Sequence, residues 1–364
     1  MTQAPSRAPR PEEDWAAFCD SLKAAGEIIL RAPAPEDDFD RAEGFRYLSR
    51  LTRLGLEKYV EHGDPLSPRF FALSHETGKI GIDNPDSYYM NAAIRGEHDY
   101  RIHGQRGTVA YLGFGTYHGD YGKSGRSGLS GYLEADELEM SPDGHFEITV
   151  SRNRQPGNWL PMEADSAMLI VRQNRLDREN EILADLRIEC LDVPGPPAPL
   201  DPVDFGQKLR AAGNYVTGTA QFFANWAEGW VPHPNTLPLF DPQAYKDAHG
   251  DPNIRFHMGY WELEPDQALV IEATAPPCDY WNFQLCNYWL ESLDYRYRPV
   301  HYNTHTTRYE ADGSFRLVVA ARDLGFANWV DTEGHRRGTM GLRWVKAPHD
   351  VDPLLRVVPL ASLA

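Results

Sequence analysis

Apolar residues recur along the chain with two periods, a helical one in three segments and a strand-like one in most of the rest. In residues 12–31 and 38–61 they are spaced by three, four and seven positions, which predicts two amphipathic helices near the start of the chain. The same spacing in residues 204–230 predicts a third helix, with Asp201 or Asp204 available as its N-cap. Helices therefore precede the remaining sequence and later interrupt it.

From residue 80 onward, aromatic and β-branched residues alternate with turn residues, a pattern typical of antiparallel strands. The densest stretch is 280–343, where three strand-like runs are separated by turn signals. Asp312-Gly313 between two of these runs is a strong hairpin signal. A polar, glycine-dense stretch at 117–131 is interpreted as a long hairpin loop, with a mobile lid as the alternative.

Two of these β-rich blocks have a similar order of residues. In the first, Asp143-Gly144 is followed by Asn158-Trp159 and Arg172, and in the second, Asp312-Gly313 is followed by Asn328-Trp329 and Arg343. The step from phenylalanine to asparagine is 12 residues in the first block (146 to 158) and 13 in the second (315 to 328). A repeat of this length fits two related β-sandwich units, with chance recurrence as the alternative.

The two Asn-Trp pairs have two interpretations. Each asparagine is expected to bond backbone groups at a turn while its tryptophan fills the core, which would make Asn158-Trp159 and Asn328-Trp329 paired structural corners. Alternatively, the tryptophan faces stack on a sugar or another ring system.

The predicted fold class is mainly β with helical additions (α+β), built from two related antiparallel β-sandwich units that arose by internal duplication. Residues 1–79 form a disordered start and an N-terminal helical segment, and residues 80–191 form the first sandwich. A linker and connecting helix occupy 192–253, and 254–364 form the second sandwich.

Composition narrows the classes of partner. The formal net charge of −17 argues against nucleic acid and anionic membrane surfaces, because phosphate groups are bound through clustered lysine and arginine. The 4 cysteines form no CxxC pair, which is typical of a reducing compartment. There is no secretory h-region and no run of 18 apolar residues, so a cytoplasmic protein without a membrane span is expected.

Several phrases of the sequence resemble one bacterial family. They are Ala42-Glu43-Gly44-Phe45-Arg46-Tyr47-Leu48, Asp64-Pro65, Asp83-Asn84-Pro85-Asp86, Tyr100-Arg101-Ile102 with Gly104 and Arg106-Gly107, the run from Val171 to Arg178 with Glu181, and the aromatic block that contains Asn328-Trp329. This likeness, from about Ala42 to Val345, is to the family catalogued as domain of unknown function 1214, found elsewhere joined to domain 1254. It implies a β-sandwich with helical additions, the second unit being 1214-like, and supplies no catalytic residues.

The best candidate for acid-base chemistry lies in the second block. Asp331 and His335 are close in sequence, and a carboxylate beside an imidazole raises its basicity and fixes its tautomer. Asp294, on a neighbouring predicted segment, is the third candidate catalytic residue. The alternative is an ordinary turn at 331–334, with His335 at the end of a strand.

The same block supplies candidate substrate-binding residues. Asn328 and Asn303 would orient polar groups of a substrate, with Arg343 as a further polar contact. The aromatic residues of this region are too many for a single buried face, so some are expected to line a cleft. The aromatic members of the predicted site are Trp289, Trp329, Tyr280 and Tyr295.

No cofactor or metal is expected. Neither a dinucleotide fingerprint nor a phosphate loop is present, and no GxSxG nucleophile motif occurs. His301 and His305 are four apart, but on a strand they would lie roughly 13 Å apart, too far for one ion. The aspartates at 37–40 are interpreted as a helix cap.

The leading functional hypothesis is a cofactor-independent hydrolase or lyase that acts on a neutral or cationic small molecule with rings, sugar-like or polycyclic. His335 and Asp331 would be its acid/base pair. The rival is a non-catalytic carbohydrate- or small-ligand-binding β-sandwich, in which the same aromatic residues bind and no proton moves. A third reading is a structural or assembly protein, and a homo-oligomer stays open.

Overall fold

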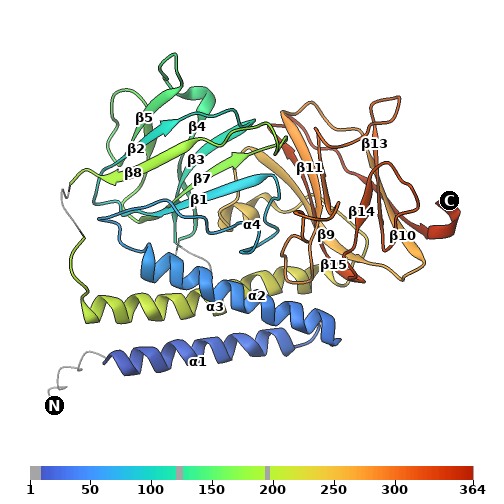
Figure 1. The fold of residues 1–364 in the computed structure, drawn as a ribbon, viewed down its shortest axis with the longest axis horizontal. Helices are drawn as coiled ribbons and strands as arrows, with labels where there is room; N and C mark the ends of the chain where they lie inside the picture. The colour runs from blue at the N-terminus through green and yellow to red at the C-terminus, as the bar shows by residue number, and fades with distance from the viewer. Residues whose placement is uncertain (1–9, 120–125, 193–196, 364) are drawn as a thin grey trace.

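The protein consists of two β-rich units side by side, with long helices along one side of them (Figure 1). The structure is a computed structural model that describes residues 10–119, 126–192 and 197–363. The expected disordered start, the middle of the expected loop at 117–131 and part of the expected linker after residue 192 lie outside the described residues. Helix α1 is the outermost layer, and α2 and α3 lie between it and the sheets.

The helical period of the sequence corresponds to three long helices. They are α1 (Pro11–Leu30), α2 (Asp38–Leu56), which continues as a π-helical turn η1 (Glu57–Glu61), and α3 (Pro202–Trp230). The Asp37 side chain accepts a hydrogen bond from the Asp40 amide at 3.0 Å, and Asp201 accepts one from the Val203 amide at 2.9 Å, so both caps are confirmed. A second, short helix α4 (Pro242–Asp247) also lies in the segment 192–253, and its six residues are too few to show a helical repeat in the sequence.

The first unit contains two four-stranded sheets. Its strands are β1 (Ser87–Ala93), β2 (Tyr100–Gln105), β3 (Tyr111–His118), β4 (Gly128–Glu134), β5 (His145–Ser151), β6 (Trp159–Pro161), β7 (Ser166–Asn174) and β8 (Asp185–Cys190), with a 3₁₀ turn η2 (Ala135–Glu137). One sheet has the order β1-β7-β3-β4 and the other has the order β6-β5-β2-β8.

The second unit repeats this arrangement. Its strands are β9 (Ile254–Glu262), β10 (Gln267–Ala273), β11 (Tyr280–Leu285), β12 (His301–Asn303), β13 (Phe315–Ala320), β14 (Trp329–Asp331), β15 (Arg337–Val345) and β16 (Leu354–Pro359), followed by η3 (Leu360–Leu363). The sheet orders are β9-β15-β11-β12 and β14-β13-β10-β16, so each strand has its counterpart eight strands earlier. Both β5–β6 and β13–β14 are parallel pairs. The mainly β fold of two similar units is confirmed.

Each sandwich has its own apolar core between its two sheets, and a third core joins the helices to the units. In the second unit, Trp281 stacks on Phe315 with 3.9 Å between ring centroids, and Trp344 packs against both. Strand β11 is buried on both faces, because the sandwich core covers one face and the chain leading into β1 covers the other.

The two asparagine corners have the same hydrogen bonds. Asn328 accepts from the Arg308 amide at 2.8 Å and donates to the Arg308 and Arg316 carbonyls at 2.8 and 2.9 Å. Asn158 accepts from the Glu139 amide at 2.7 Å and donates to the Glu139 and Glu147 carbonyls at 2.8 and 2.9 Å. The asparagines thus tie backbone at turns, as the corner interpretation predicted.

Candidate functional site

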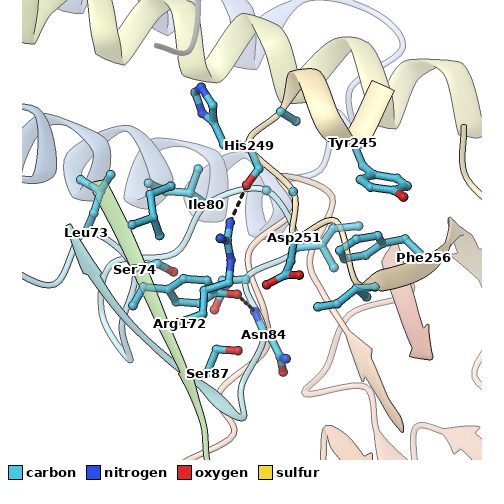
Figure 2. Close-up of a pocket in the computed structure, with 18 of the residues that line it drawn as sticks. Leu73, Ser74, Ile80, Asn84, Ser87, Arg172, Tyr245, His249, Asp251 and Phe256 are labelled. Carbon is cyan, nitrogen blue, oxygen red and sulfur yellow. Dashed lines mark hydrogen bonds between the residues drawn. The ribbon is translucent and has the colours of Figure 1, made fainter. Parts of the chain in front are cut away.

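A cavity of about 120 Å³ lies at the junction of the two units (Figure 2). Strands β1 and β7 of the first unit and β9 and β15 of the second form its walls, and α3, α4 and the chain before β1 complete it. An engineered cavity of roughly 150 Å³ in another protein binds benzene. The volume therefore suits a small organic molecule.

Two equivalent loops lead into these walls. Asn84-Pro85-Asp86 precedes β1, and Asp251-Pro252-Asn253 precedes β9, each ending directly before the strand. In both loops the first side chain accepts from the amide two residues on, at 3.0 Å, as Asn84 does from Asp86 and Asp251 does from Asn253. The duplication therefore extends beyond the strands to the loops that border the cavity.

Two buried arginines connect these loops across the junction. Arg172 and Arg343 are each the seventh residue of their strand, β7 and β15. Arg172 donates to the backbone oxygen of His249 in the second unit's loop, as Figure 2 shows, and Arg343 donates to that of Ile82 in the first unit's loop. Each unit thus holds the loop of the other through its arginine.

The acceptor residues of both loops have strained backbones. Ile82 has φ 58° and His249 has φ 60°, in the left-handed region that residues other than glycine rarely adopt. For Ile82, which is β-branched, this conformation is a genuine outlier. Strain of this kind persists where surrounding contacts enforce it, and it is found preferentially at binding sites.

The two strand walls have diverged in polarity. The first, third and fifth residues of β1 are Ser87, Tyr89 and Asn91, and those of β9 are Ile254, Phe256 and Met258. All six line the cavity. The cavity face of β1 is therefore polar and that of β9 is apolar, while the paired strands add Met168 and Ile170 from β7 and Arg343 from β15.

Some polar atoms of the lining have no protein partner. Within the described part of the chain, the buried Asn91 Oδ1 and Ser74 Oγ make no hydrogen bond. Leaving a buried polar atom unpaired costs about 1–3 kcal/mol. Both residues line the cavity, but these two atoms are themselves enclosed by protein.

The carboxylates at the cavity have partners of their own. Asp251 accepts from the hydroxyls of Tyr111 and Tyr132 at 2.8 and 3.2 Å, and burial raises the pKa of both tyrosines, which keeps them as donors. Asp83 accepts from the amide and hydroxyl of Ser292 at 2.9 and 2.7 Å. Burial raises the pKa of Asp83, although Lys79 and Ser292 oppose this effect.

Of the residues predicted to form the site, Arg343 lines the cavity. Asp331 forms an ion pair with Arg298 at 2.7 Å and accepts from the Glu333 amide at 2.9 Å, as in the turn alternative. His335 is buried, with Nδ1 3.1 Å from the Thr332 carbonyl. Burial lowers the pKa of His335 and favours the neutral ring. Asp331 and His335 thus engage different partners.

The other predicted polar residues are engaged in local contacts. Asp294 binds Arg296, and this hydrogen bond lowers the pKa of Asp294 to about 2, so the carboxylate stays ionised. Asn303 donates to Asp86 at 2.9 Å and to the Leu176 carbonyl at 3.1 Å. Asn328 is the corner described above.

The predicted aromatic residues are mostly interior. Tyr280 is buried and accepts from Asn174, Trp289 is buried and donates to the Asp40 carbonyl at 3.0 Å, and Trp329 donates to the Ala320 carbonyl at 2.8 Å. Tyr295 is half-buried, with cations at 4.9 and 4.5 Å from its ring centroid, supplied by Lys79 and Arg178. The structure does not bring these side chains into one cleft.

The carboxyl group of Asp40, at the start of α2, is buried. Burial and the charge of Asp37 raise the pKa of Asp40 to about 7, and Arg337, 3.8 Å away, opposes the shift. Between pH 4 and 7 folded Asp40 holds a proton that the unfolded chain has lost, so its contribution to stability falls as pH rises.

We expect Asp40→Asn to be more stable than the wild type at pH 8 by about 2 kcal/mol, and the difference to shrink toward pH 5. Urea unfolding of both proteins across this range measures it. Asp38→Asn, in the same helical turn but exposed, controls for the loss of a negative charge. A difference that does not change with pH would refute the buried-proton account.

The sequence contained a signal for this cavity. The three-residue pattern of an amide or acid, proline, and an acid or amide occurs at 84–86 and again 167 residues later at 251–253, the same step that separates the starts of β1 and β9. Arg172 was recognised as the counterpart of Arg343 but was not predicted as a site residue. Combining the two recurrences would have pointed to the junction.

Comparisons with known proteins identify relatives but no activity. The family described as protein of unknown function (DUF1214) matches residues 89–174, within the first unit. An uncharacterised protein from Burkholderia cenocepacia has 50% sequence identity, with 96% of this chain and 98% of that chain covered and a TM-score of 0.94. The VPA0106 protein from Vibrio parahaemolyticus has 12% identity, with coverages of 93% and 100% and a TM-score of 0.49.

No protein with curated annotation matches the chain. None of the helices in the described residues combines the length and apolar character that a membrane span requires.

Proposed function

This chain belongs to the DUF1214 family of proteins of unknown function, and we propose that it binds a small organic molecule in the cavity between its two β-sandwich units. This proposal keeps the non-catalytic ligand-binding hypothesis from the sequence, but it places the binding site between the two units and not within the second unit. The observation that carries the proposal is the pair of equivalent walls, polar on β1 and apolar on β9.

Three features support binding over a purely structural junction. Among the described residues, Asn91 Oδ1 and Ser74 Oγ have no hydrogen-bond partner, the loops that border the cavity are strained, and both arginines are buried there. A junction selected only for stability would be expected to fill the space with apolar side chains and to relax these costs. A ligand with both polar and apolar parts would match the polar face of β1 and the apolar face of β9 and fill the volume.

We expect Met258→Trp to block binding, because the larger side chain occupies the cavity from the apolar wall. A thermal-shift screen of short branched and aromatic acids, amides and alcohols should give compounds that stabilise the wild type. The gain is about 2.7 kcal/mol at a hundredfold excess over Kd. These compounds should not stabilise Met258→Trp.

The control for this test is Met140→Trp, which adds the same side chain at an exposed methionine outside the cavity. It should respond to the compounds as the wild type does. Compounds that stabilise Met258→Trp and the wild type equally would place binding elsewhere and contradict the proposal.

A hydrolase- or lyase-type activity is the second proposal. It is supported by His335, whose Nε2 has no hydrogen-bond partner among the described residues and whose lowered pKa favours a neutral base. His335 is not among the residues that line the cavity. Mass spectrometry of a bound compound after incubation with the protein decides whether it is chemically changed, and unchanged recovery argues for binding alone.

A further inference from the structure

We infer that the ligand of this cavity is a small monocarboxylate, whose acid group accepts hydrogen bonds from Arg172 and whose hydrocarbon part lies against Phe256 and Met258. The inference rests on the proposed function and adds the charge and orientation of the ligand.

The guanidinium of Arg172 has more hydrogen-bond donors than its protein partners use. A guanidinium carries five N–H donors. Arg172 donates to the Tyr117 hydroxyl at 2.7 Å and to the His249 carbonyl, which leaves donors to spare beside the cavity. Planar donors of this kind match the two oxygens of a carboxylate.

The groups that accept hydrogen bonds from the two buried arginines are uncharged. Arg343 donates to Gln284 at 2.7 Å, to the Ile82 carbonyl and, at 3.4 Å, to Asn282. Each acceptor of Arg343, like those of Arg172, is a neutral group, and among the described residues neither guanidinium forms an ion pair. Two buried positive charges with neutral partners favour a negatively charged ligand.

Ionised carboxylates near the cavity would repel an anionic ligand, so their charges must be neutralised or outweighed. Asp83 either holds a proton, since burial raises its pKa, or is balanced by Lys79, whose ammonium donates to the carbonyl of Ser292. Asp251 is the remaining carboxylate of the lining, and its oxygens accept from two tyrosines and a backbone amide. Asp86 lies next to the lining, and although burial opposes this, its hydrogen-bond partners lower its pKa; its oxygens accept from Asn282 and Asn303. With Asp83 protonated, the lining itself therefore has two guanidiniums and one carboxylate.

The residues on the two sides of the cavity would orient the ligand. Arg172 pairs with Tyr89 in the β1–β7 ladder and so lies beside the polar face of β1. Arg343 pairs with Phe256 beside the apolar face of β9, but it donates to three acceptors where Arg172 donates to two. Phe256 and Met258 stand at the equivalent positions of the opposite wall, and Phe223 and Trp226 of α3 extend the apolar surface.

Isothermal titration of the full chain with isovalerate and with isovaleramide tests the inference, because these probes share a shape and differ in charge. The acid should bind about tenfold to a hundredfold more tightly than the amide. In Arg172→Gln this preference should disappear. The control variant Arg316→Gln removes an exposed guanidinium on β13 that pairs with Glu272, and it should keep the preference for the acid.

The results distinguish a failure of the carboxylate inference from a failure of the cavity as a binding site. Equal or tighter binding of the amide by the wild type overturns the carboxylate inference but leaves the cavity as a binding site. Binding of neither probe overturns both proposals for ligands of this size. The wild-type comparison is decisive by itself, so the test holds even where Arg172→Gln does not fold.

Discussion

Replacing Arg343 with methionine is expected to lower the free energy of unfolding by about 3 kcal/mol. The substitution keeps most of the apolar stem of the side chain but removes the guanidinium and with it every donor. Gln284 Oε1 and the Ile82 carbonyl then lose a partner inside the protein, where they cannot be hydrated. Unpairing buried acceptors of a charged donor is costlier than losing an exposed ion pair.

Chemical denaturation of Arg343→Met and of a matched variant, Arg316→Met, measures this effect. Arg316 is half-exposed and pairs with Glu272 at 2.6 Å, so its loss should cost at most about 1 kcal/mol. If both variants lost the same small amount of stability, the claim that the buried arginines hold the junction together would fail.

Replacing Gly259 with alanine is expected to cost about 3 kcal/mol or more. A Cβ atom at this position of β9 would lie 1.9 Å from the Thr236 carbonyl oxygen, a backbone atom that cannot rotate away. Thr236 belongs to the segment between α3 and α4 that runs along β9. The alanine would therefore displace the chain that leads to His249 and Asp251, and ligand binding should weaken together with stability.

The control for this substitution is Gly229→Ala in α3, where a Cβ would meet nothing within 4 Å. Because alanine is a better helix former than glycine, this variant should gain about 0.5–1 kcal/mol. Urea unfolding distinguishes the two changes. A loss below about 1 kcal/mol for Gly259→Ala would mean that the segment shifts freely and does not position the cavity loops.

The elements of the fold could be read from the sequence because each is locally specified. Strongly periodic segments became α1, α2 and α3, and the recurrence of Asp-Gly, Asn-Trp and arginine reflects a strand-by-strand duplication. The asparagine corners were also predictable, since their partners are backbone groups of nearby turns. Local chemistry determines features of this kind.

The position of the site was not predictable in the same way. Its lining comes from segments around residues 74–91, 168–172, 223–226 and 245–258 with Arg343, which only the tertiary fold brings together. The density of aromatic residues in the second unit was interpreted as a cleft because they exceeded one buried face. In fact β11 is buried on both faces, so Tyr280 and Trp281 both belong to the interior.

Buried polar side chains explain the rest of the misplaced site. Asn282 donates to Asn84 and Asp86, and Gln284 donates to the Asp83 carbonyl at 2.6 Å, so these residues fasten the chain before β1 onto the second unit. In sequence, polar residues that join two units look the same as polar residues that bind a substrate. Their partners, about 200 residues away, decide between the two roles.

The most direct test of the account is a crystal structure of the full chain with isovalerate at a saturating concentration. The acid should lie in the cavity between the units, with its carboxylate within hydrogen-bonding distance of Arg172 and its methyl groups against Phe256 and Met258. An empty cavity, or isovalerate bound outside it, under conditions where titration shows saturation, would contradict the central claim.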